Sequence, residues 1–314
     1  VVENVMATLP IFAVLFVPIW IGRHELYEWT RPEVVAHSPL LQGKAPLLNE
    51  SFFFIRAVFY FTVWSALATY FSTQSQRQDE TGDERISARL RGLAPVGIIL
   101  FALTSTFAAI DWMMSLEPAW SSTMIGVYFF SGSVIAIFSF TLLVIHFAYA
   151  QGALRGVVTV EHLHDIGKLL FGFTVFWSYI AFSQYFLIWY ANIPEETIYY
   201  MKRQVGSWQS AGMLLAGGHF LVPFFFLMPR AVKRSSGLLV TAAVWQLMMH
   251  FLDLHWCVMP VLHHDGVQLG ATDVAAFCAV GGAFLAALGV ISSRRALVPL
   301  RDPRLPESLS FENV

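Results

Sequence analysis

Eight apolar runs, each long enough to cross a bilayer, constrain the fold more than any other feature of the sequence. A membrane-spanning helix needs about 20 mostly apolar residues, because the hydrocarbon offers no water to exposed backbone groups. With 56% hydrophobic and only 13% charged residues, the chain is too apolar for a soluble domain. We therefore predict an all-α integral membrane protein, a multi-span helix bundle with transmembrane helices at residues 5–22, 51–73, 93–113, 124–149, 169–191, 208–228, 238–259 and 274–291.

Two prolines interrupt the first of these runs, at Pro10 and Pro18. Proline removes a backbone donor and kinks a helix, but membrane helices tolerate it where neighbouring helices satisfy the freed carbonyls. The first span is therefore expected to be kinked.

Basic residues collect on one set of helix ends, which is cytoplasmic by the positive-inside rule. This rule places both termini inside, together with a solvated loop at residues 74–91. The opposite ends carry only Arg23, Arg31, Lys44, Lys202 and Arg203, whereas the richer ends carry Arg77, Arg85, Arg89, Arg91, Arg155, Lys168, Arg230, Lys233, Arg234, Arg294, Arg295, Arg301 and Arg304.

Cysteine content limits the cofactors that the chain can attach. Cys257 and Cys278 are the two cysteines, and both lie inside apolar runs. They provide no disulfide framework, no Cys-x-x-Cys-His haem attachment and no ligand set for an iron–sulfur cluster. A redox centre in this chain would need histidine ligands.

The seventh run, at residues 238–259, carries a line of polar residues at Gln246, His250, Asp253 and Cys257. At about 100° per residue, their offsets of four, seven and eleven from Gln246 return to one helical face. A carboxyl group at that depth costs about 2–3 kcal/mol or more unless it is solvated or paired. The pattern indicates a helix that handles protons.

Other polar residues at membrane depth extend this line into a predicted proton relay. His250 and Asp253 would form its centre, with His219, Gln184 and Gln246 as neighbours. The inner end would consist of His146, His164 and Asp165, and the outer end of Asp111 and Glu117. Ordered by depth, these residues form a discontinuous polar ladder across the membrane.

Structural and functional alternatives remain open for these residues. His146 suits an interhelical hydrogen bond, and Arg56 with Asp111 suits a buried ion pair. His219 and His250 together could ligate one haem b iron from two helices. An independent transporter is a further alternative, although the sequence lacks paired interrupted helices in matching positions.

Three long segments resemble a known family. They are DWMMSLEPAWSST at residues 111–123, followed by GVYF at 126–129, HDIGKLLFGF at 164–173, and FSQYFLIWYANIPEET at 182–197. These segments resemble the second polysulfide-reductase-type, NrfD-like membrane subunit of alternative complex III. The resemblance runs from about residue 5 to residue 291.

The resemblance implies an assembly that oxidises quinol and passes electrons to a periplasmic acceptor such as a cytochrome c. Quinol, iron–sulfur clusters and c-type haems would belong to partner subunits, and this chain would bind no cofactor. The expected partners are the quinol-binding NrfD-like sister subunit, an iron–sulfur subunit, multihaem and monohaem cytochrome c subunits, and the lipid bilayer. No nucleic acid is expected. The implied location is the bacterial cytoplasmic membrane, with both termini in the cytoplasm.

The family has two four-helix bundles and ten spans, so the eight spans expected here imply an incomplete first bundle. The resulting division is residues 1–123 for that bundle, 124–265 for the second bundle, 266–292 for a peripheral helix and 293–314 for a cytoplasmic tail. The chain is expected to be a scaffold and proton conduit. Within the quinol-oxidising complex it would be a non-catalytic or proton-conducting subunit. The alternative is a quinone- or haem b-binding anchor subunit of another respiratory oxidoreductase.

Overall fold

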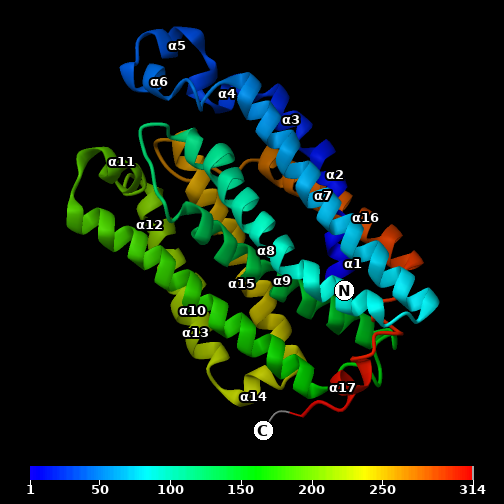
Figure 1. Cartoon of the computed structure of the whole chain (residues 1–314). Helices are drawn as coiled ribbons and strands as arrows, with labels where there is room; N and C mark the ends of the chain where they lie inside the picture. The colour runs from blue at the N-terminus through cyan, green and yellow to red at the C-terminus, as the bar shows by residue number, and fades with distance from the viewer. Residues whose placement is uncertain (313–314) are drawn as a thin grey trace. The chain divides into compact units, whose positions relative to one another are not determined.

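The computed structural model describes residues 1–312, and all regular structure within them is helical. Many large apolar side chains on the long helices remain exposed, as expected for surfaces that face lipid. The predicted all-α, multi-span fold is confirmed, and the chain is an integral membrane protein. Within the described range, eight helical segments are long and apolar enough to span a membrane, at Val2–Ile21, Glu50–Thr81, Arg85–Leu116, Ile125–Ala150, Val160–Ala191, Ser207–Leu227, Ser236–Val261 and Ala271–Arg294 (Figure 1).

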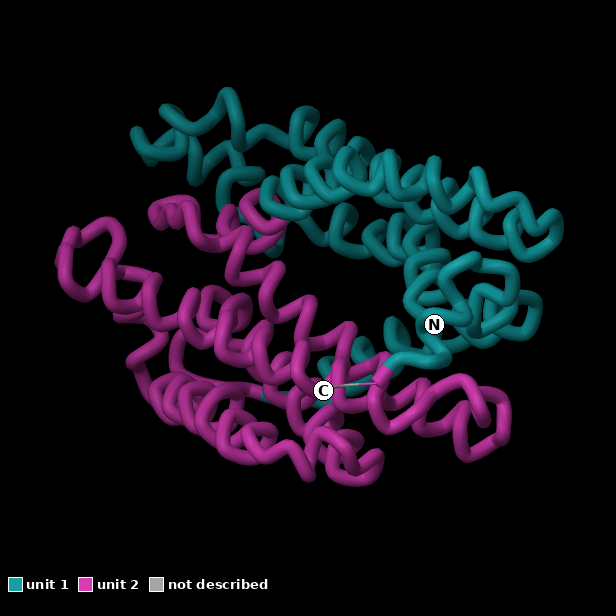
Figure 2. Tube along the Cα trace, turned by 60° about the horizontal axis from the view of Figure 1, so that its bottom comes forward, with its two compact units in different colours: residues 1–108, 269–311 teal, residues 109–268, 312–314 magenta. Residues whose placement is uncertain are grey.

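Two compact units divide the chain (Figure 2). Unit 1 contains residues 1–108 and 269–311, and unit 2 contains residues 109–268 with Glu312. The predicted bundle repeats divide the chain by sequence order, whereas these units divide it by spatial contact. The division into an incomplete and a complete bundle therefore stays a prediction.

The first span of unit 1 is built from three short helices, α1 (Val2–Met6), α2 (Leu9–Leu15) and α3 (Val17–Ile21). Pro10 and Pro18 stand in the first turns of α2 and α3, where a missing backbone donor costs no internal hydrogen bond. The span is therefore interrupted before each proline, and the predicted kink stays a prediction. Four short elements follow the span, namely α4 (Arg23–Leu26), η1 (Glu28–Thr30), α5 (Pro32–Ala36) and α6 (Pro39–Lys44).

Helices α7 (Glu50–Thr81) and α8 (Arg85–Trp112) form a long hairpin. Gly82, with φ of 70°, ends α7 in the left-handed conformation that glycine adopts without steric cost. The predicted solvated loop at residues 74–91 is wrong, because most of it is helical. Its Gln, Glu and Arg residues are good helix formers, and Gln78 Nε2 donates to Ser87 Oγ across the hairpin at 2.7 Å.

The C-terminal part of unit 1 contains α16 (Ala271–Arg294) and α17 (Leu305–Leu309). The tail at 293–314 is tied to the end of α7, because the backbone N–H of Arg301 donates to Asp79 Oδ1 at 3.0 Å and its Nη1 to the Glu80 carbonyl at 2.8 Å. Residues 313–314 of that tail lie outside the described residues. At the other terminus, the amino group of Val1 donates to the Leu297 carbonyl at 3.0 Å.

Unit 2 is organised around three long helices, α9 (Ile125–Ala150), α10 (Val160–Ala191) and α15 (Ser236–Val258), of which α9 packs against both others (Figure 1). Buried aliphatic side chains fill their interface. The remaining helices of the unit are η2 (Met114–Leu116), α11 (Pro194–Lys202), α12 (Ser207–Leu214), η3 (Leu215–Leu221), α13 (Val222–Leu227), α14 (Arg230–Lys233) and η4 (Met259–Val261).

The segment η3 is a π-helix in the middle of the sixth span. A π-helix widens the turn and changes the direction of the side chains that follow. Trp245 Nε1 donates to the Gly218 carbonyl at 2.7 Å, which fixes α15 to this wide turn. A Cβ on Gly218 would lie 2.6 Å from Met249 Sδ, so a larger residue here would displace the end of the Met249 side chain. His219 is carried by this segment.

Candidate functional site

The carboxyl group of Asp253 is the centre of the polar interior of unit 2 and is 1% exposed. Two aromatic residues hold it. The Tyr128 hydroxyl donates to Oδ1 from α9, and Trp177 Nε1 donates to Oδ2 from α10 at 3.1 Å. A buried carboxylate without partners costs several kcal/mol, and these two donors offset that cost.

The two donors differ in what they allow Asp253 to do. An indole N–H only donates, so Oδ2 stays an acceptor in both charge states. A phenol hydroxyl donates or accepts, so it can also accept from Oδ1 when the carboxyl group is protonated. Asp253 can therefore gain or lose a proton while both hydrogen bonds persist.

Two imidazoles lie next to this carboxyl group. His250 Nδ1 is 3.9 Å from Asp253 Oδ2, and the ring centroids of His250 and His219 are 6.3 Å apart. The His219 ring also packs against Trp177, with centroids 4.0 Å apart. Neither ring nitrogen of His219 has a hydrogen-bond partner among the described residues, although the side chain is 0% exposed. The structure thus brings together three residues of the predicted relay, His219, His250 and Asp253.

The two predicted glutamines are engaged at other places. Gln246 Nε2 donates to Thr174 Oγ1 at 2.7 Å, which links α15 to α10. Gln184 Oε1 accepts from Ser122 Oγ at 2.9 Å, and its Nε2 donates to the Tyr200 hydroxyl at 3.3 Å. Gln184 therefore belongs to the outer part of unit 2, with partners in the segments that precede α9 and follow α10.

The predicted inner end consists of separate local contacts. His146 Nδ1 lies 2.9 Å from Ser236 Oγ, which is the interhelical hydrogen bond of the structural alternative. Asp165 Oδ1 pairs with Lys168 Nζ at 2.6 Å on the surface of α10, and His164 is buried near the start of the same helix. Their role in a proton path stays a prediction.

The predicted outer end has two buried acids. Glu117 Oε1 pairs with Arg203 Nη1 at 2.9 Å, and Glu117 Oε2 lies 3.7 Å from Lys202 Nζ. Asp111 is 2% exposed, and its backbone carbonyl accepts from the Ser115 hydroxyl. Because Arg56 belongs to unit 1 and Asp111 to unit 2, the ion pair suggested for them stays a hypothesis.

Arg203, which the sequence pattern marks only as a basic residue at a helix end, has several buried partners in this region. Besides Glu117, its guanidinium donates to the carbonyls of Trp256 at 3.1 Å, Cys257 at 2.6 Å and Tyr199 at 2.8 Å. It also lies 3.4 Å above the centroid of the Tyr199 ring. We call Arg203 with Glu117, Tyr199, Trp256 and Cys257 the Arg203 clamp.

Burial and neighbouring charges have opposite effects on the pKa values of the clamp residues Arg203 and Tyr199. Burial disfavours the charge on Arg203, but Tyr199 and Glu117 outweigh it and raise the pKa of the guanidinium. Burial raises the pKa of the Tyr199 hydroxyl well above its ordinary value, although Arg203 opposes this. Burial raises the pKa of Tyr200 in the same way. The region therefore combines a permanent cation with neutral phenols at physiological pH.

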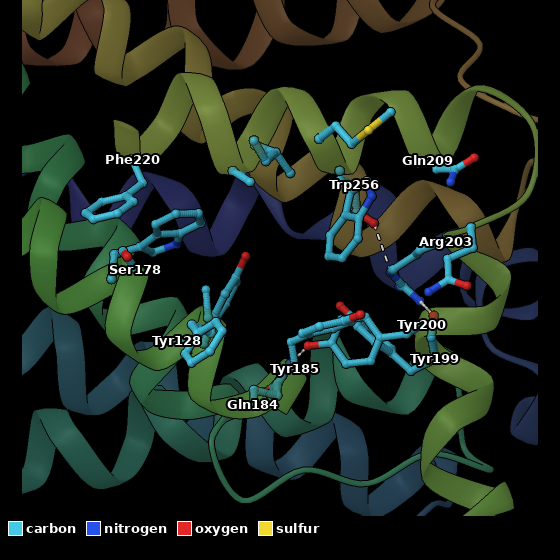
Figure 3. A pocket seen from close by; sticks show the side chains of 18 residues that line it. Tyr128, Ser178, Gln184, Tyr185, Tyr199, Tyr200, Arg203, Gln209, Phe220 and Trp256 are labelled. Atoms are coloured by element: carbon cyan, nitrogen blue, oxygen red, sulfur yellow. Dashed lines mark hydrogen bonds between the residues drawn. The ribbon is translucent and has the colours of Figure 1, made fainter. Parts of the chain in front are cut away.

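A cavity of about 720 Å³ extends from Tyr128 and Trp177, the two donors to Asp253, to residues of the Arg203 clamp. Figure 3 shows aromatic side chains around an open space, with Phe220 and Ser178 at one end and Arg203 and Gln209 at the other. Its lining residues belong to unit 2 and are Tyr128, Trp177, Ser178, Ala181, Phe182, Gln184, Tyr185, Tyr199, Tyr200, Arg203, Gln204, Gln209, Gly212, Met213, Leu215, Ala216, Phe220 and Trp256.

Helical spacing alone identified His250 and Asp253, but it gave no sign of their partners. Tyr128 and Trp177 lie on other helices, and only the packing of α9 and α10 against α15 brings them to Asp253. Within residues 1–312, no three His, Cys, Asp or Glu side chains are grouped to hold a metal ion. The predictions about cofactors stay predictions. A comparison of the sequence with protein-family models and with curated proteins gives no match.

Proposed function

We propose that the chain is a membrane subunit of a quinol-oxidising complex of the alternative complex III type, where it serves as scaffold and proton conduit. The observation that carries the proposal is the carboxyl group of Asp253, which is buried in unit 2 between two donors and beside His250. Ionisable groups at membrane depth usually belong to ion or proton pathways. The resemblance of residues 111–129, 164–173 and 182–197 supplies the type of complex.

In this proposal, quinol oxidation in partner subunits changes the protonation of Asp253. Tyr128 can relay a proton between Oδ1 and the cavity, because its hydroxyl donates in one charge state and accepts in the other. His250 and His219 continue the path on the other side of the carboxyl group. Water molecules would connect these groups to the two surfaces.

The proposal also includes a location and partners. The chain would lie in the bacterial cytoplasmic membrane with both termini inside, beside the quinol-binding sister subunit, the iron–sulfur subunit and the cytochrome c subunits. The positions of the basic residues support this orientation. The contact between Val1 and Leu297 supports placing the two ends of the chain on one side of the membrane.

The test is Asp253→Asn in the whole complex, reconstituted in proteoliposomes after its assembly has been verified. Asparagine keeps the shape of the side chain but cannot be ionised. We expect quinol turnover to continue while vectorial proton movement falls about a hundredfold or more, the usual order for loss of a proton-transfer group. Asp273→Asn is the matched control, since Asp273 lies at the start of α16, where its carboxylate accepts a hydrogen bond from the backbone of Gly270.

Unchanged proton movement in Asp253→Asn would contradict the conduit and leave the scaffold. The visible spectrum of the same preparations addresses the haem b alternative, which the 6.3 Å spacing of the His219 and His250 rings favours. A Soret band of the isolated chain that disappears in His219→Ala would show that His219 ligates a haem, and it would contradict the proposed conduit. A colourless chain agrees with the proposal.

A further inference from the structure

Four basic residues gather at the end of unit 2 where the sixth and seventh spans are joined. The connection contains α14, which contacts α10, α13 and α15 (Figure 1). Arg230, Lys233 and Arg234 belong to this connection, and Lys168 belongs to α10. All four interact electrostatically with His164, so they lie near one buried side chain of α10.

Two of these cations have acidic partners on α10. Glu161 Oε1 lies 2.6 Å from Arg234 Nη2, and Asp165 Oδ1 lies 2.6 Å from Lys168 Nζ. The first pair also joins the connection to the start of α10. Since each acid neutralises one cation, these two pairs add no net charge to the region.

The other two cations, Arg230 and Lys233, have no carboxylate partner among the described residues. Lys233 Nζ instead donates to the carbonyls of Leu227 at 2.6 Å and Met228 at 2.8 Å, at the end of α13. Burial lowers the pKa of this ammonium, because it loses water without gaining a counter-charge. Arg230 is exposed. The region therefore carries two positive charges in excess.

The start of α15 adds further positive potential. This helix begins at Ser236, and the side chain of its N-cap residue, Ser235, makes no capping hydrogen bond. The free N–H groups of a first turn and the helix dipole both attract anions. Basic residues so close to this end of a helix are unfavourable unless an anion lies beside them. Space for an anion exists at Gly237, where a Cβ would meet nothing within 4 Å.

An unsatisfied polar atom lies among the same cations. His164 is 7% exposed, and its Nδ1 has no hydrogen-bond partner among the described residues. Buried ring nitrogens are normally paired with a protein group, a water molecule or a ligand. An anion beside the ring would supply the acceptor for a proton on Nδ1.

The membrane itself supplies anions at this depth. The sixth span ends at Leu227 and the seventh begins at Ser236, so the connection between them lies at the level of the lipid head groups. Phe225 and Leu238, which belong to these two spans, are exposed apolar residues. A phosphate that carries acyl chains therefore contacts the basic residues and the apolar surface together, whereas a free phosphate contacts only the basic residues.

We propose that the connection between the sixth and seventh spans binds the head group of an anionic phospholipid. Phosphate oxygens accept hydrogen bonds from Arg230 and from the first-turn N–H groups of α15, and the acyl chains lie along Phe225 and Leu238. Basic pockets between membrane-spanning helices bind such head groups in other membrane proteins. The two excess charges match a lipid with two phosphates, diphosphatidylglycerol. The site is separate from the proposed proton conduit.

Equilibrium binding of radiolabelled diphosphatidylglycerol to the full 314-residue chain tests the proposal. The chain is held in micelles of a neutral maltoside detergent, and binding to empty micelles is subtracted. Phosphatidylcholine with the same acyl chains and inorganic phosphate, at an ionic strength matched with sodium chloride, serve as competitors. We expect one bound lipid per chain and at least about tenfold weaker competition by phosphatidylcholine, because each basic residue contributes about fivefold at an anionic surface.

Variants locate the bound head group. Arg230→Gln removes one uncompensated charge and should weaken binding about fivefold. Arg294→Gln is its matched control, because Arg294 is an exposed arginine at the opposite type of helix end, the last residue of α16. We expect this control to bind the lipid as the unaltered chain does.

A second pair of variants tests the start of α15. Gly237→Asp places a carboxylate where we assign the phosphate, and it should weaken binding about tenfold or more. Aspartate suits a first helical turn, so this variant should keep the helix. Gly237→Ser is the uncharged control at the same open position and should leave the affinity unchanged.

Three results would overturn the proposal. They are equal competition by phosphatidylcholine, unchanged affinity in both Arg230→Gln and Gly237→Asp, and displacement of the lipid by inorganic phosphate, which would assign the site to a free anion. Loss of lipid binding leaves the proton measurements on Asp253→Asn unaffected. Conversely, unaltered proton movement in that variant leaves the lipid site standing.

Discussion

At the scale of single residues, the position of His250 depends on the absence of a side chain at Gly132. A Cβ at position 132 would lie 2.6 Å from Cε1 and 2.9 Å from Nδ1 of the imidazole. Both distances are far below van der Waals contact, so any side chain there displaces the ring. The geometry around Asp253 therefore relies on a glycine of the neighbouring helix α9.

We predict that Gly132→Ala destabilises the chain by about 1–3 kcal/mol, the usual cost of inserting a methyl group into a packed interior. SDS titration in mixed micelles measures the free energy of unfolding. Gly172→Ala on α10 is the control, because nothing lies within 4 Å of a Cβ there, and it should be neutral or stabilising. Equal effects of both substitutions would show that His250 moves aside without cost.

The residues of the candidate site were predictable to different degrees. His250 and Asp253 share a face of one helix, so the helical period places them together from sequence. Tyr128 and Trp177 depend on how three helices pack, which no spacing within one helix reports. Arg203 looked like a loop cation because its carbonyl partners are backbone groups, which a sequence does not distinguish.

At the scale of secondary-structure elements, the Arg203 clamp joins α11 to the segment before α9 and to the end of α15. Arg203 is 2% exposed and Glu117 is 5% exposed. Removal of one partner from a buried ion pair leaves the other charge desolvated, at a cost of about 3–5 kcal/mol. We predict a loss of this order for Arg203→Met, measured by the same titration.

A double-mutant cycle separates the ion pair from the bonds to the carbonyls. Arg203→Met with Glu117→Gln should be less destabilising than the sum of the single variants, because no uncompensated carboxylate remains. Lys202→Met is the control, since that ammonium lies 3.7 Å from Glu117 and is 36% exposed. It should change stability by about 0–1 kcal/mol. A larger loss of stability in Lys202→Met than in Arg203→Met would show that Lys202, and not Arg203, is the stabilising partner of Glu117.

Element boundaries were harder to predict than element types. The polar residues at 74–91 look like a loop because apolar content marks only the part of a helix inside the hydrocarbon. In the structure, α7 continues to Thr81 and α8 begins at Arg85. The π-helix η3 was also unpredictable, since a uniform 100° per residue misplaces every side chain beyond it.

At the scale of the whole molecule, the even number of candidate spans within residues 1–312, eight, predicts that the two ends of the chain lie on the same side of the membrane. We predict that reporter fusions after residues 84 and 312 show green fluorescence and no alkaline phosphatase activity. Fusions after residues 204 and 268 should show the reverse, because the phosphatase folds only outside the cytoplasm. The opposite pattern at all four points would invert the membrane orientation derived from the basic residues.

The number of spans could be predicted because length and apolarity are directly visible in a sequence. The grouping of the spans could not be predicted, since unit 1 combines residues 1–108 with residues 269–311, and residues 109–268 of unit 2 separate these two segments in sequence. The association of these two segments depends on surface complementarity between helices that are far apart in sequence. Sequence-based prediction was therefore more successful for the class of fold than for its contacts.

The Arg203 clamp also has a consequence for biogenesis. Its partners are far apart along the chain, with Glu117 86 residues before Arg203 and Cys257 54 residues after it. During synthesis, Arg203 joins the chain before the carbonyl of Cys257 exists. The clamp therefore cannot close until the seventh span has been made, and a nascent chain halted earlier would leave Arg203 without two of its carbonyl partners.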